Sequence, residues 1–251
     1  MSGLTTPLTK DYTDVPHEDV ACPLCTSKSD AVLARTGYPG IPVRTVICRG
    51  CGLIRINPRM IPKGYEDFYT QDFFEYLNPY DRPAYVEIIE RTTDDTFETP
   101  VERNTLPYML PYVKEGGRML DVGSGFGQVI YLLAKKKGVS YVGIEPDPES
   151  RKVAKEKIGI DLIDTTIEDY ITSDCGLFDF IHLDQVFEHL LRPLEALKSM
   201  GQVLTPEGVI YLGVPNAYNP GVSMDRFYEL AHTYAYTPAT MHLFAKQSGL
   251  K

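Results

Sequence analysis

From Arg118 onward, short apolar runs alternate with stretches of helical periodicity. The runs have the length of buried strands, and the stretches between them carry apolar residues three and four positions apart, as amphipathic helices do. Strands are predicted over 118–122, 140–144, 161–163, 179–183 and 208–214, and helices over 128–137, 148–158 and 238–248. This alternation predicts an α/β fold built on a Rossmann-like, doubly wound parallel sheet.

A glycine-rich turn joins the first predicted strand to the first predicted helix. It reads D-V-G-S-G-F-G, with Asp121 followed by Gly123, Gly125 and Gly127. Glycine lets a nucleotide approach the main chain closely and tolerates positive φ. In the dinucleotide fingerprint G-x-G-x-x-G the third glycine would stand at Gln128, and the carboxylate of Asp121 would repel a pyrophosphate. The turn therefore favours a ligand with an ammonium group and makes a dehydrogenase the least consistent reading. A plain glycine turn without a ligand is the alternative.

Further polar residues follow the ends of other predicted strands. Glu145 ends the second strand, 22 positions after Gly123, where an acidic residue is placed to accept hydrogen bonds from ribose hydroxyls. Because ligands of open α/β sheets bind beyond the carboxyl ends of the strands, these positions predict one shared site. Its other members are Thr166, Asp184, Gln185 and Asn216. The alternatives are a solvated turn charge at Glu145 and a helix N-cap at Thr166.

Four cysteines in two C-x-x-C pairs precede this domain. Cys22 and Cys25 form the first pair, and Cys48 and Cys51 follow after twenty-two residues. This is the spacing of a four-thiolate zinc site, with two disulfides as the alternative. Since cysteine fills all four ligand positions, the metal is predicted to be structural rather than catalytic.

The chain is expected to have four consecutive parts. A flexible lead-in over 1–18 precedes a zinc ribbon over 19–60. Residues 61–105 form an aromatic-rich helical lid or linker, with a helix over 86–98, and 106–251 form the α/β domain. Most of the aromatic side chains between Tyr65 and Tyr85 are expected to cover an edge of that domain, and a few tyrosines to line an acceptor pocket.

Charge and hydropathy narrow the class of protein further. The chain has 251 residues and a net charge of −9, which argues against a broad phosphate-binding surface and makes a nucleic-acid partner unexpected. No apolar run approaches the length of a membrane span, and the polar N-terminus does not resemble a secretory signal. A cytoplasmic setting, where thiols stay reduced, is expected.

Taken together, the motifs resemble those of class I S-adenosylmethionine (SAM) methyltransferases over roughly residues 106–251. The resemblance rests on D-V-G-S-G-F-G (121–127), G-I-E-P-D (143–147), F-D-F-I-H-L-D-Q-V-F-E-H-L (178–190) and L-T-P-E-G-V-I-Y-L-G-V-P-N (204–216). It implies SAM as the cofactor, with the adenine held by backbone groups around Ile167. The run E-H-L-L-R-P resembles members that act on small molecules. The ribbon followed by a tyrosine-rich segment is similar to methyltransferases of sugars and cell-surface glycans, some of them sugar C-methyltransferases.

The resemblance implies methyl transfer from SAM to a small polar acceptor, a sugar or glycan precursor. His189, just past the fourth strand, and His232 are candidates for removing the acceptor's proton, because imidazole titrates near neutrality. The alternative for both is a hydrogen-bonded role within the fold. His182 is expected to be structural, and Glu188 is expected to be an acidic residue at a helix N-terminus.

Two other functions remain open from the sequence. An RNA methyltransferase would use positive charge on the ribbon, from Arg44, Arg49, Arg55 and Arg59. A non-catalytic SAM-fold scaffold would fit a sheet without its last two strands, which the family carries after the helix predicted over 238–248. A sheet edge left open in this way also predicts self-association into a homo-oligomer.

Overall fold

The chain folds into two units, each assembled from segments that are distant in the sequence. The structure, a computed structural model, describes residues 12–38, 40–72, 87–171 and 175–250. Unit 1 comprises Met1–Asn78, Phe187–Lys198 and Val214–Lys251, and unit 2 comprises Pro79–Val186 and Ser199–Gly213. Within the described ranges, every helix is too short or too polar to span a bilayer. The four-part division expected from the sequence remains a prediction.

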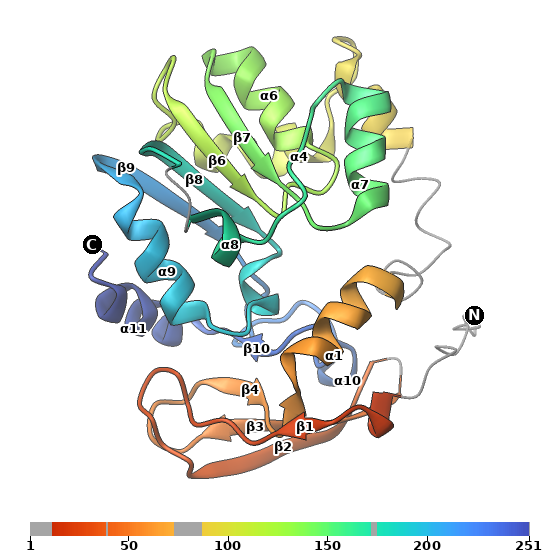
Figure 1. Ribbon diagram of the computed structural model, residues 1–251, viewed down its shortest axis with the longest axis vertical. Coiled ribbons are helices and arrows are strands. Elements are labelled where there is room, and N and C mark those ends of the chain that lie inside the picture. The colour runs from red at the N-terminus through yellow and green to blue at the C-terminus, as the bar shows by residue number, and fades with distance from the viewer. Residues whose placement is uncertain (1–11, 39, 73–86, 172–174, 251) are drawn as a thin grey trace. The chain divides into compact units, whose positions relative to one another are not determined.

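Parallel strands form the centre of unit 2 (Figure 1). The described strands lie in the order β7-β6-β8-β9, and each neighbouring pair is parallel. They are β6 (Arg118–Val122), β7 (Ser140–Ile144), β8 (Phe178–Asp184) and β9 (Leu204–Gly213). The chain proceeds from β6 to β7 on one side and from β8 to β9 on the other, so the strand order reverses between β6 and β8. Such a switch point is where open α/β sheets bind ligands, and the predicted fold class is confirmed.

Capping residues mark the ends of two helices in unit 2. Asp147 caps α7 by accepting from the Ser150 N–H at 2.7 Å, with Pro148 in the first helical position. Gly138 ends α6 in the left-handed conformation. The described helices are α4 (Pro100–Asn104), α5 (Leu106–Met109), α6 (Gln128–Lys137), α7 (Pro148–Val153) with its π-helical continuation η4 (Ala154–Ile158), and α8 (Ile167–Ile171). Helix α9 (Pro193–Gln202) runs from unit 1 into unit 2.

Two predicted elements of unit 2 are wrong. The strand expected over 161–163 is a single bridge between Ile144 and Ile163, held by one backbone hydrogen bond on each side of that pair. The helix expected over 86–98 ends with the 3₁₀ turn η3 (Arg91–Thr93). The Asp94 side chain there accepts from the Thr96 N–H at 2.9 Å, which offers the backbone a turn in place of a further helical hydrogen bond.

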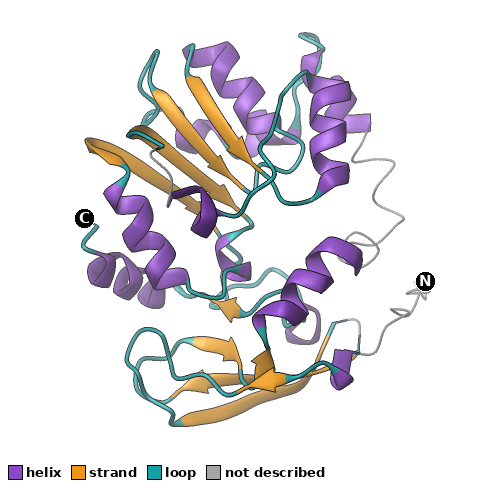
Figure 2. Cartoon of the chain, viewed as in Figure 1, coloured by secondary structure: helices purple, strands orange, loops and turns teal. Residues whose placement is uncertain are grey.

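Unit 1 is built on an antiparallel sheet in the order β10-β4-β3-β2. Its strands are β2 (Asp30–Gly37), β3 (Ile41–Cys48), β4 (Ile54–Ile56) and β10 (Tyr234–Ala235), and β1 (His17–Glu18) pairs separately with β5 (Arg59–Met60). Strand β10 pairs Tyr234 with Arg55 of β4, so a late segment completes the sheet that the N-terminal region begins. Figure 2 shows the strands in orange and the helices in purple.

Short helices and aromatic side chains fill the core of unit 1. The described helices are η1 (Tyr12–Asp14), α1 (Pro62–Asp67) with its π-helical continuation η2 (Phe68–Asp72), η5 (Phe187–His189), α10 (Met224–Phe227) and α11 (Pro238–Ser248). The ring of Phe187 stacks on Tyr236 and meets Phe244 edge-on. Tyr65, Phe68 and Tyr69 of the aromatic segment pack within this unit, whereas Phe73, Phe74, Tyr76, Tyr80 and Tyr85 lie outside the described residues.

Candidate functional site

The glycine turn lies at the carboxyl end of β6, beside the switch point. Gly123, Gly125 and Gly127 have φ values of +64°, +53° and +73°, a region that side chains with a Cβ rarely adopt. A Cβ added at Gly123 would come within 2.5 Å of Val186, but one added at Gly125 would meet nothing within 4 Å. The turn therefore needs its glycines and leaves open space beside Gly125.

Asp121, the acidic residue of the same motif, is paired with a histidine. It is buried near the end of β6, where the sheet register places it opposite His182 of β8. The Nδ1 atom of His182 donates to Oδ1 of Asp121 at 2.6 Å, and the imidazole stacks on Tyr211 with 5.5 Å between ring centroids. His182 thus orients the carboxylate of the glycine-turn motif.

Glu145 bridges the end of β7 and the glycine turn. One carboxylate oxygen accepts from the Gly125 N–H at 2.8 Å, and the other accepts from the Asp147 N–H at 2.9 Å. Burial raises the pKa of Glu145 to about 7, against the lowering effect of these two N–H groups; the nearby charges of Asp147 and Asp121 raise it further. The solvated turn charge considered as an alternative does not fit a side chain that is 9% exposed.

This raised pKa predicts how stability depends on pH. A carboxyl group whose folded-state pKa lies above its ordinary 4.5 stabilises the fold most below pH 4.5 and loses that contribution as pH rises through about 7. Relative to that of Glu145→Gln, the free energy of unfolding of the wild type should therefore fall by about 3 kcal/mol between pH 4.5 and 7.5. Urea unfolding of both proteins across this range measures the difference, and a constant difference would contradict the assignment.

The remaining predicted residues of this edge have distinct roles. Gln185 has a φ of +56°, strained for a residue with a side chain, and its N–H donates to Gly213 O at 2.9 Å just after Asp184 ends β8. Thr166 accepts from the Asp169 N–H at 3.3 Å, as a cap of α8 does, and Ile167 is buried at the start of that helix. Asn216 belongs to unit 1, where its side chain accepts from the Tyr218 N–H.

A second group of titratable side chains lies within unit 1. The ring centroids of His189 and His232 are 5.0 Å apart, and His232 Nε2 lies 3.9 Å from Oε1 of Glu188. Burial, and next the neighbouring His189, lower the pKa of His232 to about 3, so its imidazole is neutral near pH 7. The structure thus brings the two predicted histidines together and adds a buried carboxylate to them.

Hydrogen bonds orient the His189 ring, and a close contact with a carboxylate faces the His232 ring. The Nδ1 atom of His189 lies 2.9 Å from the Ala231 carbonyl and 3.0 Å from the Tyr69 hydroxyl, and His232 Nδ1 lies 3.0 Å from Oε1 of Glu229. Because a carbonyl oxygen and a carboxylate only accept, both contacts place the proton on Nδ1. Burial is also the main cause that raises the pKa of Tyr69 well above its ordinary value, so its hydroxyl stays protonated.

Sequence reasoning missed three members of this group. Tyr69, Glu188 and Glu229 are far apart in the chain, and Glu188 was expected to be a helix-terminal charge, whereas its side chain is 1% exposed. The available signal was the adjacency of Glu188 and His189 directly after a buried strand.

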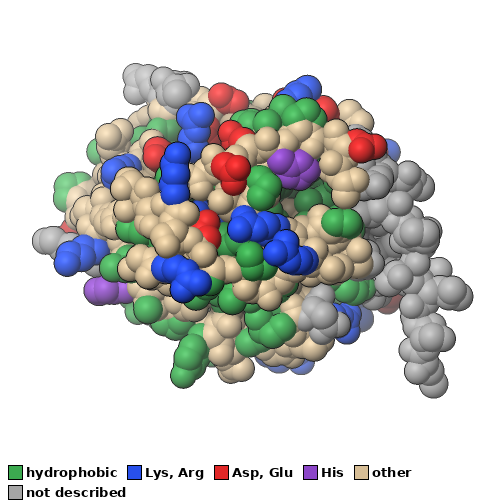
Figure 3. All heavy atoms as spheres, turned by 90° about the horizontal axis from the view of Figure 1, so that it is seen from below, with side chains coloured by type: hydrophobic (Ala, Val, Ile, Leu, Met, Phe, Trp, Pro, Cys, Tyr) green, Lys and Arg blue, Asp and Glu red, His purple; other side chains and the backbone are tan. Residues whose placement is uncertain are grey.

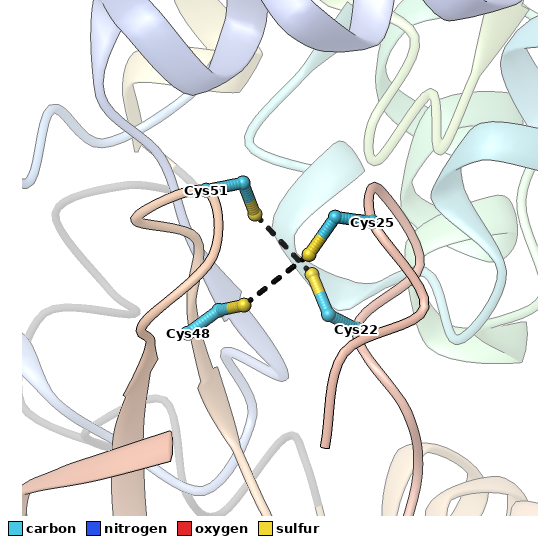
Figure 4. A group of neighbouring side chains, drawn as sticks. All are labelled: Cys22, Cys25, Cys48 and Cys51. Atoms are coloured by element: carbon cyan, nitrogen blue, oxygen red, sulfur yellow. Dashed lines mark hydrogen bonds between the residues drawn. The ribbon is translucent and has the colours of Figure 1, made fainter. Parts of the chain in front are cut away.

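The four predicted zinc ligands lie together in unit 1 (Figure 4). The Sγ atoms of Cys22 and Cys51 are 3.4 Å apart, as are those of Cys25 and Cys48, and all four point toward one centre. None of the described cysteines forms a disulfide, so the disulfide alternative is not supported.

The two cysteine turns have the same backbone hydrogen bonding. The Thr26 N–H donates to Cys22 O at 2.8 Å, and the Gly52 N–H donates to Cys48 O at 2.9 Å. Thr26 and Gly52 both have positive φ, +58° and +80°. The Gly50 N–H also points at Cys48 Sγ, at 3.4 Å. Each turn thus presents its two sulfurs from a tight backbone loop.

Comparison with known proteins establishes the family. A family model described as a methyltransferase domain matches residues 98–251, more than half of the chain, and the chain therefore belongs to this family of methyltransferases. Two solved structures share the fold: a SAM-dependent methyltransferase from Archaeoglobus fulgidus (TM-score 0.53, 19% identity, 69% of this chain and 74% of that chain) and the plantazolicin methyltransferase BpumL, solved with a desmethylPZN analog and SAH (TM-score 0.51, 20% identity, 73% of each chain).

Curated relatives are similar over part of their length. A ribosomal protein L11 methyltransferase from Thermotoga neapolitana is 33% identical over 99 residues, 38% of this chain and 37% of the relative. A ubiquinone biosynthesis O-methyltransferase from Actinobacillus pleuropneumoniae is 33% identical over 125 residues, 44% of this chain and 53% of the relative. The chain thus matches about a third to a half of these two relatives.

Proposed function

We propose that the protein transfers a methyl group from SAM to a small polar acceptor, a sugar or glycan precursor. The observation that carries the proposal is the convergence of the glycine turn, Asp121, Glu145 and Asp184 at the carboxyl ends of three adjacent strands, at the switch point of the sheet. Family membership and the shared fold support it.

Each part of this edge suits one part of SAM. The open space beside Gly125 admits the cofactor close to the main chain, and the Glu145 carboxylate is the acceptor for ribose hydroxyls. The adenine is assigned to the backbone near Ile167, with Thr166 shaping the turn before it. The carboxylates of Asp121 and Asp184, with Gln185, are assigned to the methionine end, whose ammonium group they attract.

The acceptor class rests on three supports. The sequence around Glu188 resembles methyltransferases that act on small molecules, and the ribbon resembles those of sugars and glycans. A relative at 33% identity is named a ubiquinone biosynthesis O-methyltransferase, and this name agrees with a small-molecule acceptor. A cytoplasmic setting is part of this proposal, because nucleotide-linked sugars and reduced thiols occur there.

The structure weakens the RNA alternative. Two of the four arginines that favoured it are buried and paired: Arg55 with Asp30 at 2.9 Å, and Arg59 with Glu18 at 3.0 Å. Arg44 donates to the Asn57 carbonyl. On the face shown in Figure 3, Lys and Arg side chains are interspersed with Asp and Glu and form no continuous basic surface. RNA binding generally needs such a surface.

In methyl transfer the protein mainly aligns the acceptor with the methyl group of SAM and removes the acceptor's proton. As the acceptor's nucleophilic atom attacks the methyl carbon, a new bond to carbon forms, the carbon–sulfur bond breaks, and S-adenosylhomocysteine leaves. The acceptor's proton must also depart, and we assign this assistance to His189 and His232. His189 follows Asp184 by five positions in the chain.

Transfer of isotopically labelled methyl groups tests the proposal. Label from SAM should enter small polar acceptors such as nucleotide sugars, and not total RNA. With the acceptor found, His189→Ala should lower kcat by roughly 100-fold or more, the usual contribution of a positioned acid or base, and leave the Kd for SAM nearly unchanged.

His242→Ala is the matched control, because His242 is an exposed histidine on α11. Label found in RNA alone would contradict the acceptor class. Equal losses of turnover and SAM affinity in His189→Ala would make His189 structural.

We further propose that the four cysteines hold a structural zinc ion. The observed Sγ–Sγ separations of 3.4 Å are close to the edge of a tetrahedron with Zn–S bonds of 2.3 Å, about 3.8 Å. The donor set is all thiolate, so the ion would join the two cysteine turns and take no part in methyl transfer.

A further inference from the structure

We propose that Glu188, His189 and His232 form a second metal site, which holds a divalent transition-metal ion. One ring nitrogen of each histidine and one carboxylate oxygen of Glu188 lie within 4.8 Å of one another. Two ligand atoms bonded to one ion at about 2.0–2.1 Å can be at most about 4.2 Å apart. The 3.9 Å between His232 Nε2 and Glu188 Oε1 already meets this limit.

The surroundings of the two histidines match those of metal ligands. A metal-bound histidine usually donates its second ring N–H to a carbonyl or a carboxylate, which fixes the tautomer and the ring orientation. His189 Nδ1 has the Ala231 carbonyl at 2.9 Å, and His232 Nδ1 has the Glu229 carboxylate at 3.0 Å. Both contacts leave the lone pair on Nε2, the atom through which each ring would bind the ion.

The chemistry of the donors indicates the kind of ion. Two imidazoles and one carboxylate suit Zn²⁺ and other divalent first-row metals, and three protein ligands leave a coordination position open. This contrasts with the closed four-thiolate cluster of the same unit. If the protein is a methyltransferase as proposed, His189 and His232 would assist proton loss as ligands of the ion and not as free bases, because an ion here would act as a Lewis acid that favours the deprotonated form of an acceptor hydroxyl. The site itself does not depend on that activity.

Metal content tests the proposal. Untagged full-length protein is loaded with excess Zn²⁺, passed through a desalting column and analysed by mass spectrometry for metal per chain. We expect two equivalents in the wild type and one in both Glu188→Gln and His232→Gln. Glu229→Gln should retain the site and weaken its affinity for Zn²⁺ by roughly 10–100-fold. The exposed-histidine control, His242→Gln, should retain two equivalents.

Cobalt substitution identifies which site each ion occupies. Co²⁺ in the cysteine cluster gives thiolate charge-transfer absorption. A second equivalent, bound at Glu188, His189 and His232, should add Co²⁺ absorption that lacks the thiolate charge-transfer band. A wild type that takes up one ion with the thiolate signature would overturn the proposal, as would two ions in both Glu188→Gln and His232→Gln. SAM binding measured on the same samples separates this result from the proposed methyltransferase function, because SAM binds at residues of unit 2.

Discussion

Replacing Cys48 by serine is expected to abolish zinc binding at the cysteine cluster and unfold the sheet of unit 1. Structural zinc sites contribute about 10–16 kcal/mol of apparent binding free energy, comparable with the whole stability of a typical domain. Cys48 ends β3, and its N–H donates to Leu53 O before the chain enters β4, so the loss of the ion would release both strands. Zinc content and hydrogen exchange in β3 and β4 measure the effect.

The fifth cysteine provides the control for this experiment. Cys175 is buried in unit 2 and takes no part in the cysteine cluster, so Cys175→Ser should keep its zinc and its protection in β3 and β4. Unchanged exchange in Cys48→Ser, with zinc lost, would show that the ion does not support the fold.

Gly125→Arg is expected to abolish SAM binding while the fold persists. The position has positive φ, and a Cβ there meets no atom within 4 Å, so an arginine side chain would extend into the space assigned to the cofactor. We expect the Kd for SAM to rise by more than about 100-fold, or roughly 2.7 kcal/mol. Titration calorimetry measures the affinity, and thermal unfolding reports on the fold.

Gly138→Arg controls for the backbone strain. Gly138 also has positive φ, +60°, and open space at its Cβ, but it ends α6 at the opposite end of that helix from the glycine turn. Both variants should lose similar stability, and Gly138→Arg alone should bind SAM as the wild type does. An equal loss of SAM affinity in both would assign the effect to strain rather than to an occupied site.

Local signals in the sequence predicted the parallel sheet and its glycine turn. Strand, glycine turn and helix are consecutive, and Glu145 follows at a spacing typical of the fold, so these elements could be predicted without any distant contact. The pairing of Asp121 with His182 was missed because it joins residues 61 positions apart through the sheet register. His182 was expected to be structural. That expectation agrees with its burial but did not identify Asp121 as its partner.

Unit 1 was harder to predict because distant segments build it. Strand β10 adds to the ribbon sheet, and Gln247 of α11 donates to Leu24 O beside the first cysteine turn at 2.8 Å. Arg55 and Arg59 looked like surface charge, since a single sequence shows the charge and not the buried carboxylate that neutralises it. The cluster around Glu188 was hidden for the same reason.

The most direct test of the account is calorimetric titration of the zinc-loaded protein with SAM and, separately, with NAD. Asp121 at the mouth of the turn and Gln128 in place of a third glycine predict one SAM per chain and no measurable binding of NAD. Binding of NAD without SAM, or of neither cofactor by a folded, zinc-loaded protein, would contradict the assignment of this edge as a SAM site.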